Sequence, residues 1–95
     1  QNEKECYLCR KFYGTSNEIG LEEHHVFGGN ANRKLSEQYG LKVWLCQRHH
    51  NTPPFGVHFN QKHMEILRKD AQREFEKTHT RDEFTKIFGR NYDTN

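Results

Sequence analysis

Three cysteines and seven histidines are the side chains of this chain best suited to bind metal ions. Cys6 and Cys9 are separated by two residues, and the pair Cys46 and His49 repeats that spacing further along the chain. Zinc binds four such donors in a tetrahedron, and two short loops that supply two ligands each suit it well. The spacing therefore predicts a structural Zn²⁺ with four ligands: Cys6, Cys9, Cys46 and His49.

Two features of this assignment stay open at the level of sequence. His50 is next to His49, and the two-residue spacing favours His49 because a shift of one residue would point the imidazole elsewhere. The alternative to a zinc site is that Cys6 and Cys9 are free or redox-active thiols. Three cysteines cannot all pair as disulfides, so the composition indicates a reducing, intracellular compartment.

A second group of histidines remains once His49 is assigned to zinc. His24 and His25 are adjacent on an expected strand, so their side chains should point to opposite faces. One imidazole could then bind a divalent ion while the other accepts a proton from water, the chemistry of metal-assisted phosphodiester hydrolysis. Further ligands would come from His50 and His58. The alternative is that both are solvated strand residues bonded to Glu22 or Glu23.

The elements that must position these residues are short. Alternation and turn residues predict strands at 21–27 and 41–45, with a helix at 33–39 between them and a loop at 51–56 that contains both prolines. A helix is expected from about residue 60, with its apolar stripe at Met64, Leu67, Ala71 and Phe75. Thr80 and Glu83 have the spacing of a capping box for a last helix.

Composition limits the class of protein. The chain has 95 residues, of which 32% are hydrophobic, and a net charge of +2. We expect a single α+β domain, with the knuckle and strands in residues 1–59 and C-terminal helices in residues 60–95. A chain this short with so few hydrophobic residues has a small core, which favours stabilisation by a bound metal ion. A mean hydropathy of −1.18 and the lack of a long apolar run exclude a transmembrane helix.

The residues 21–29, LEEHHVFGG, and 45–51, LCQRHHN, resemble the HNH family, the ββα-metal or His-Me finger nucleases. The resemblance runs from Cys6 to about His63 and includes both zinc half-knuckles, which the zinc-stapled branch places in the same way. The stretch 56–58 is similar to small phage-borne members. The resemblance implies a small ββα-metal finger that cleaves DNA with one divalent ion such as Mg²⁺, Mn²⁺, Ni²⁺ or Zn²⁺ and leaves a 5′ phosphate.

By the same resemblance, His24, His50 and His58 are ligands of the catalytic ion and His25 is the general base. Two departures from the family pattern matter. The middle Asn of the family aligns with Leu41, so Asn30 or Asn32 would have to brace the loop. The gap from His50 to His58 exceeds one helical turn and contains two prolines, so the loop must fold back, with His63 as the competing ligand.

The resemblance implies DNA as the partner and the cytoplasm of a bacterial host, with phage or prophage origin, as the location. Contacts to phosphates are expected from four basic residues near the ion: Arg33, Lys34, Lys42 and Arg48. Arg68, Lys69 and Arg73 are expected on a solvated helix face. A protein partner could supply targeting. The rival hypotheses are a non-catalytic zinc knuckle that binds nucleic acid or protein, and a degenerate HNH fold that serves phage recombination or packaging.

Overall fold

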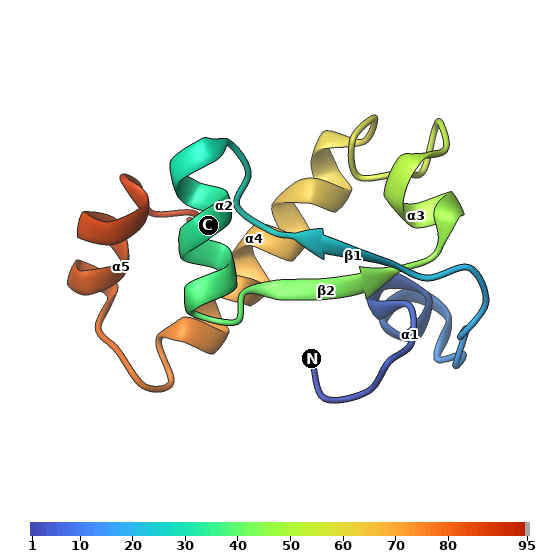
Figure 1. The fold of residues 1–95 in the computed structure, drawn as a ribbon, viewed down its shortest axis with the longest axis horizontal. Helices are drawn as coiled ribbons and strands as arrows, with labels where there is room; N and C mark the ends of the chain where they lie inside the picture. Colours follow the sequence, from blue (N-terminus) through green and yellow to red (C-terminus); the bar gives the residue numbers. More distant parts are fainter. Residues whose placement is uncertain (95) are drawn as a thin grey trace.

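A computed structural model describes residues 1–94 as a small α+β protein. Within these residues the order of elements is α1 (Tyr7–Tyr13), β1 (Glu22–His25), α2 (Asn30–Gln38), β2 (Lys42–Leu45), α3 (Gln47–Asn51), α4 (Gln61–Phe75) and α5 (Arg81–Phe88). The two strands form an antiparallel sheet at the centre of the molecule (Figure 1). Helices α1 and α3 lie at one end of the sheet, and α2 and α5 lie at the other (Figure 1). The expectation of an α+β fold is confirmed.

The sheet is shorter than the sequence pattern predicts. Its register pairs Glu22 with Leu45 and His25 with Lys42. Val26 and Phe27 follow β1 and are buried, and the Val26 N–H still donates to the Leu41 carbonyl at 3.1 Å. The expected strand 21–27 therefore contains a paired part and a buried extension that turns into the core.

Ser36 braces the turn that follows β1. The Ser36 side chain is fully buried; its hydroxyl accepts from the Phe27 N–H at 3.1 Å and donates to the Phe27 carbonyl at 2.9 Å. A serine on α2 thus satisfies both backbone groups of a buried residue. The bracing role of Asn30 or Asn32 in the loop between the strands stays a prediction.

The helices that follow residue 60 agree with the prediction. Asn60 caps α4, and Thr80 and Glu83 form the expected capping box of α5. The apolar stripe of α4 faces inward, with Leu67 and Phe75 buried. Phe27 joins these helices to the sheet, because its ring lies 5.4 Å from that of Phe84 and close to two further C-terminal rings. The C-terminal helices and the sheet therefore share one core.

Helix α1 is absent from the sequence prediction, which places a short loop at the first cysteine pair. Its residues carry no extended apolar stripe. Instead Cys6 caps the helix, because its sulfur accepts from the Cys9 N–H at 3.4 Å, and Gly14 ends it with a φ of +68°. The left-handed conformation at the end of a helix favours glycine. Capping at both ends therefore defines a helix that periodicity does not reveal.

Candidate metal centres

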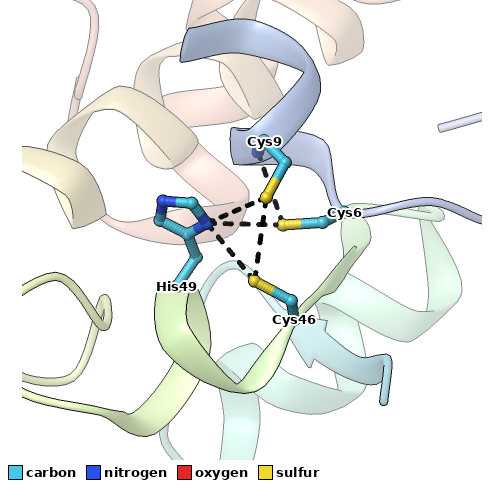
Figure 2. A group of neighbouring side chains, drawn as sticks. All are labelled: Cys6, Cys9, Cys46 and His49. Atoms are coloured by element: carbon cyan, nitrogen blue, oxygen red, sulfur yellow. Dashed lines mark hydrogen bonds between the residues drawn. The ribbon is translucent and has the colours of Figure 1, made fainter. Parts of the chain in front are cut away.

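Four side chains gather between α1 and α3, and we call them the Cys3His cluster: Cys6, Cys9, Cys46 and His49 (Figure 2). All four are buried, and the three cysteines are free thiols rather than disulfides. Their potential ligand atoms all lie within 4.8 Å of one another. The predicted spacing therefore brings the four candidate ligands to one point.

The local structure explains why both pairs have the same spacing. Cys6 is the N-cap of α1 and Cys9 is its third helical residue, and Cys46 and His49 have the same positions in α3. The N-cap and third residues of a helix lie on the same side of the first turn. Each half of the cluster is therefore the first turn of a short helix, and the two turns face each other.

The distances in the Cys3His cluster suit a tetrahedral ion. With Zn–S bonds near 2.3 Å and Zn–N bonds near 2.0 Å, the edges of such a tetrahedron are about 3.8 Å between two sulfurs and about 3.5 Å between sulfur and nitrogen. The two sulfurs of Cys9 and Cys46 are 3.8 Å apart. His49 Nδ1 lies 3.4 to 3.6 Å from the three sulfurs. The group is compatible with a structural zinc ion.

The environment of this cluster supports a metal-binding form of its ligands. Burial, followed by the nearby His63 and Arg48, lowers the pKa of His49, so its imidazole is neutral and can donate a lone pair. The Asn17 side-chain amide lies 3.6 Å from the Cys9 sulfur, to which it can donate. His49, and not His50, contributes to this cluster.

A second group of imidazoles lies outside the first, and we call it the three-histidine cluster: His24, His50 and His58. Its potential ligand atoms also lie within 4.8 Å of one another. His58 Nε2 and His50 Nε2 are 3.2 Å apart, and the His24 ring centroid is 5.3 Å from both neighbouring rings. Three residues from a strand, a helix and a loop thus meet at one place.

The loop after α3 folds back to bring His58 into this cluster. The Val57 N–H donates to the His49 carbonyl at 2.8 Å, and the His58 N–H contacts the His50 carbonyl at 3.4 Å. Gly56 allows this close return, because a Cβ there would lie 2.7 Å from the Thr52 nitrogen. Any larger residue at position 56 would therefore push the loop away from α3.

His63, which competes with His58 as a candidate metal ligand, has a different role. Its Nδ1 lies 2.7 Å from the Phe55 carbonyl, to which the ring N–H donates, and its ring centroid is 5.0 Å from that of Phe12. His63 therefore fixes the loop to α4 and packs beside α1. It belongs to neither the Cys3His cluster nor the three-histidine cluster.

Burial favours the neutral form of two imidazoles in the three-histidine cluster. Burial, and then the neighbouring His50 and His58, lower the pKa of His24 to about 4. Burial and His50 also lower the pKa of His58. Within residues 1–94, the buried Nε2 atom of His24 has no hydrogen-bond partner. A neutral imidazole with an unsatisfied buried nitrogen is costly alone and suited to metal binding.

Glu22 orients one ligand of this cluster. His50 Nδ1 lies 3.2 Å from a Glu22 carboxylate oxygen, which can only accept, so Nδ1 carries the proton and Nε2 keeps its lone pair. This is the carboxylate–histidine pairing that fixes metal ligands in proteins. From sequence, Glu22 is considered only as a partner of the adjacent histidine pair, so this contact between β1 and α3 is a finding of the structure.

His25 points away from the three-histidine cluster toward α2. Its Nε2 lies 2.9 Å from the Glu37 carboxylate, and Lys42 binds the same carboxylate at 2.9 Å. Lys42, and to a lesser extent His25, lower the pKa of Glu37, which therefore stays ionised. Since a carboxylate accepts, Nε2 of His25 is the protonated nitrogen of this pair and Nδ1 keeps the free lone pair.

An open cavity of about 580 Å³ joins the two adjacent histidines, and we call it the histidine cavity. The three-histidine cluster, His25 and Arg33 all line it. Within residues 1–94, β1 pairs with β2 alone, so side chains from both of its faces can reach the cavity around its other edge. His24 and His25, although they point in opposite directions, therefore both line the histidine cavity.

The four expected phosphate contacts are placed differently from one another. Arg33 lines the histidine cavity, and Lys34 lies beside it next to His25 and Glu37. Lys42 is engaged by Glu37 and Glu23, which offset its charge. Arg48 lies over the Phe55 ring at 4.5 Å and does not line the cavity.

Arg68 differs from its expected place on a solvated helix face. It lines the histidine cavity, and its Nε atom is buried. The available signal is its spacing of four from Met64, which belongs to the apolar stripe and lines the same cavity. Arg73 behaves as expected and pairs with Asp93 at the surface.

Comparison of the chain with protein-family models, with curated proteins and with solved structures gave no match. No helix within residues 1–94 combines the length and apolar character needed to cross a membrane. The site geometry and the chemistry of its residues are therefore the basis for a functional assignment.

Proposed function

We propose that this protein is a metal-dependent DNA endonuclease of the HNH, or ββα-metal, type. The observation that carries the proposal is the three-histidine cluster, which faces an open cavity that also receives His25. Catalytic metal sites in proteins typically have three protein ligands and an open position, and this cluster has that form. The order of the elements β1, β2 and α3 around it supports the family resemblance of residues 21–29 and 45–51.

The Cys3His cluster is proposed to hold a structural zinc ion. Its four ligands are buried and fill the coordination sphere of a tetrahedral ion, which leaves no position for a substrate. It fixes α1 against α3 and so holds His50, the residue after His49, at the sheet. The proposal therefore assigns separate tasks to two metal centres.

The histidine cavity supplies the groups that hydrolysis of a phosphodiester requires. A divalent ion bound by three imidazoles would offset the negative charge of the phosphate and of the departing oxygen. His25 Nδ1 would accept a proton from the water that attacks phosphorus, while Glu37 holds the opposite side of the ring. Arg33 on the cavity wall provides a positive charge toward a neighbouring phosphate of DNA.

Plasmid cleavage in the presence of Mg²⁺, Mn²⁺, Ni²⁺ or Zn²⁺ tests the proposal. His25→Ala should reduce nicking at least 100-fold, because it removes the base, and should retain both metal ions and the fold. His79→Ala is the matched control, because its ring stacks on Phe75 far along the chain from both clusters. Equal nicking by wild type and His25→Ala would contradict the assignment. One bound ion per chain without cleavage would favour the non-catalytic zinc knuckle.

A further inference from the structure

Arg68 has an unusual environment for an arginine near the surface of a small protein. Its Nε atom is buried and lacks a hydrogen-bond partner within residues 1–94. Other arginines of the C-terminal helices bind carboxylates: Arg73 and Arg81 both pair with Asp93. A buried N–H of a cationic group without an acceptor is costly, so an acceptor outside the described chain that binds the remaining N–H groups of the guanidinium would offset this cost.

The position of Arg68 indicates the charge of that acceptor. Arg68 and the three-histidine cluster line the same cavity. A guanidinium facing a site for a divalent cation repels that cation unless an anion lies between the two. Neutral imidazoles supply no such anion, and Glu23, the single carboxylate among the described residues that line the cavity, binds Lys42. The geometry therefore calls for an anionic ligand between Arg68 and the histidines.

The C-terminal segment holds Arg68 in this position. The Arg68 guanidinium lies over the Tyr92 ring, 5.5 Å from its centroid. The Tyr92 N–H donates to the side-chain oxygen of Gln72 at 2.7 Å, and the amide of this fully buried glutamine donates to Asn91 at 2.6 Å. The Tyr92 ring also packs 5.0 Å from that of Phe27. Tyr92 is therefore a fixed surface against which Arg68 rests.

Cation–π contact alone does not account for this arrangement. Arg90 lies over the same Tyr92 ring at 4.6 Å, yet Arg90 is exposed and does not line the cavity. Contact with an aromatic face leaves the in-plane N–H groups of a guanidinium free. Those N–H groups suit two oxygens of a phosphate.

We infer that Arg68 binds a non-bridging oxygen of the phosphodiester in the histidine cavity, and that Tyr92 positions its guanidinium for this contact. The inference rests on the proposed nuclease function and extends it to residues after position 60. The C-terminal helices thus contribute a substrate-binding residue as well as a scaffold.

Inorganic phosphate is the probe for a test that needs no catalysis. In ¹H–¹⁵N spectra, the Nε–H signal of Arg68 should shift on titration with phosphate, whereas that of Arg90 should not. Tyr92→Leu should weaken this phosphate response several-fold, and Tyr92→Phe, which keeps the ring, should preserve it. Absence of a phosphate-dependent shift at Arg68 in the wild-type protein would overturn the inference.

Hydrolysis of bis(4-nitrophenyl) phosphate provides the second readout. Arg68→Ala should lower kcat/KM about 100-fold, as expected when a donor to a reacting phosphate is removed. Arg68→Lys should recover part of that loss, and Arg90→Ala should stay within about twofold of wild type. Metal content and thermal melts should match wild type in all three variants. Full activity of a folded Arg68→Ala would also overturn the inference.

The two proposals can fail separately. If the wild type cleaves DNA, His25→Ala does not, and Arg68→Ala is fully active, the role of Arg68 is wrong and the nuclease assignment stands. If phosphate shifts the Arg68 signal but the wild type cleaves no DNA with any of the four ions, the anion site stands and the nuclease assignment is wrong.

Discussion

The Cys3His cluster and the three-histidine cluster lie side by side in sequence at His49 and His50, yet they differ in enclosure. All four members of the first are buried. In the second, His24 is buried, His50 is half-buried and His58 is exposed. The first joins two helix termini, whereas the second opens into a cavity.

Under the proposed function, this difference in enclosure would separate a structural metal site from a catalytic one. A closed set of four ligands leaves no room for a substrate, and its binding free energy contributes to folding. A set of three ligands that faces solvent leaves positions for water and phosphate. Ligand identity alone does not distinguish the two centres, because histidine serves both; enclosure and ligand number do.

The largest effect is expected at the closed centre. Cys6→Ser should release zinc and unfold the chain, because structural zinc contributes on the order of 10 kcal/mol and the apolar core is small. Mass spectrometry under native conditions and far-UV circular dichroism would measure both losses. His63→Ala, which alters a histidine packed beside His49 but outside the cluster, should keep the zinc. A cooperative thermal unfolding transition of zinc-free Cys6→Ser would contradict the structural role of the Cys3His cluster.

The next effect is expected at the open centre. His24→Ala should remove one of two bound ions per chain while the zinc at the Cys3His cluster and the cooperative melt are retained. The reason is that an ion at the open centre would bind after the chain has folded and would therefore contribute less to the stability of the fold. Elemental analysis together with thermal unfolding would show this. Loss of both ions from His24→Ala would mean that the two centres are not independent.

The smallest effect should come from the carboxylate behind one ligand. Glu22→Gln removes the charge that orients His50, and we expect metal affinity at the open centre to fall about 10- to 100-fold. Competition with a chelator of known affinity would measure the change. Glu74→Gln, which alters an exposed carboxylate paired with Lys77, is the matched control and should have no effect. Unchanged metal affinity in Glu22→Gln would show that the Glu22–His50 contact does not orient this ligand.

Much of the closed centre follows from sequence because its spacing is local. An N-cap residue and the third residue of the helix share one side of a turn, so a two-residue spacing already places each pair of ligands together. The capping box of α5 and the apolar stripe of α4 are local in the same sense. These features need no knowledge of long-range packing.

The parts that sequence reasoning missed depend on contacts between distant segments. Ser36 braces the Phe27 backbone across the turn, a role that its residue type does not reveal. Arg68 reaches the histidine cavity only because α4 packs against the sheet and because the C-terminal segment returns to support it. In a helix rich in charged residues, periodicity places a long side chain near the boundary of the apolar stripe but does not say which way its head group turns.

The five residues of α3 carry one ligand toward each centre. If both centres bind ions as proposed, this shared helix would set an order of assembly: the ion of the Cys3His cluster would fix the helix that carries His50 and so would be bound first. An ion at the open centre, which faces a cavity, would then exchange with the surroundings more readily than the enclosed one.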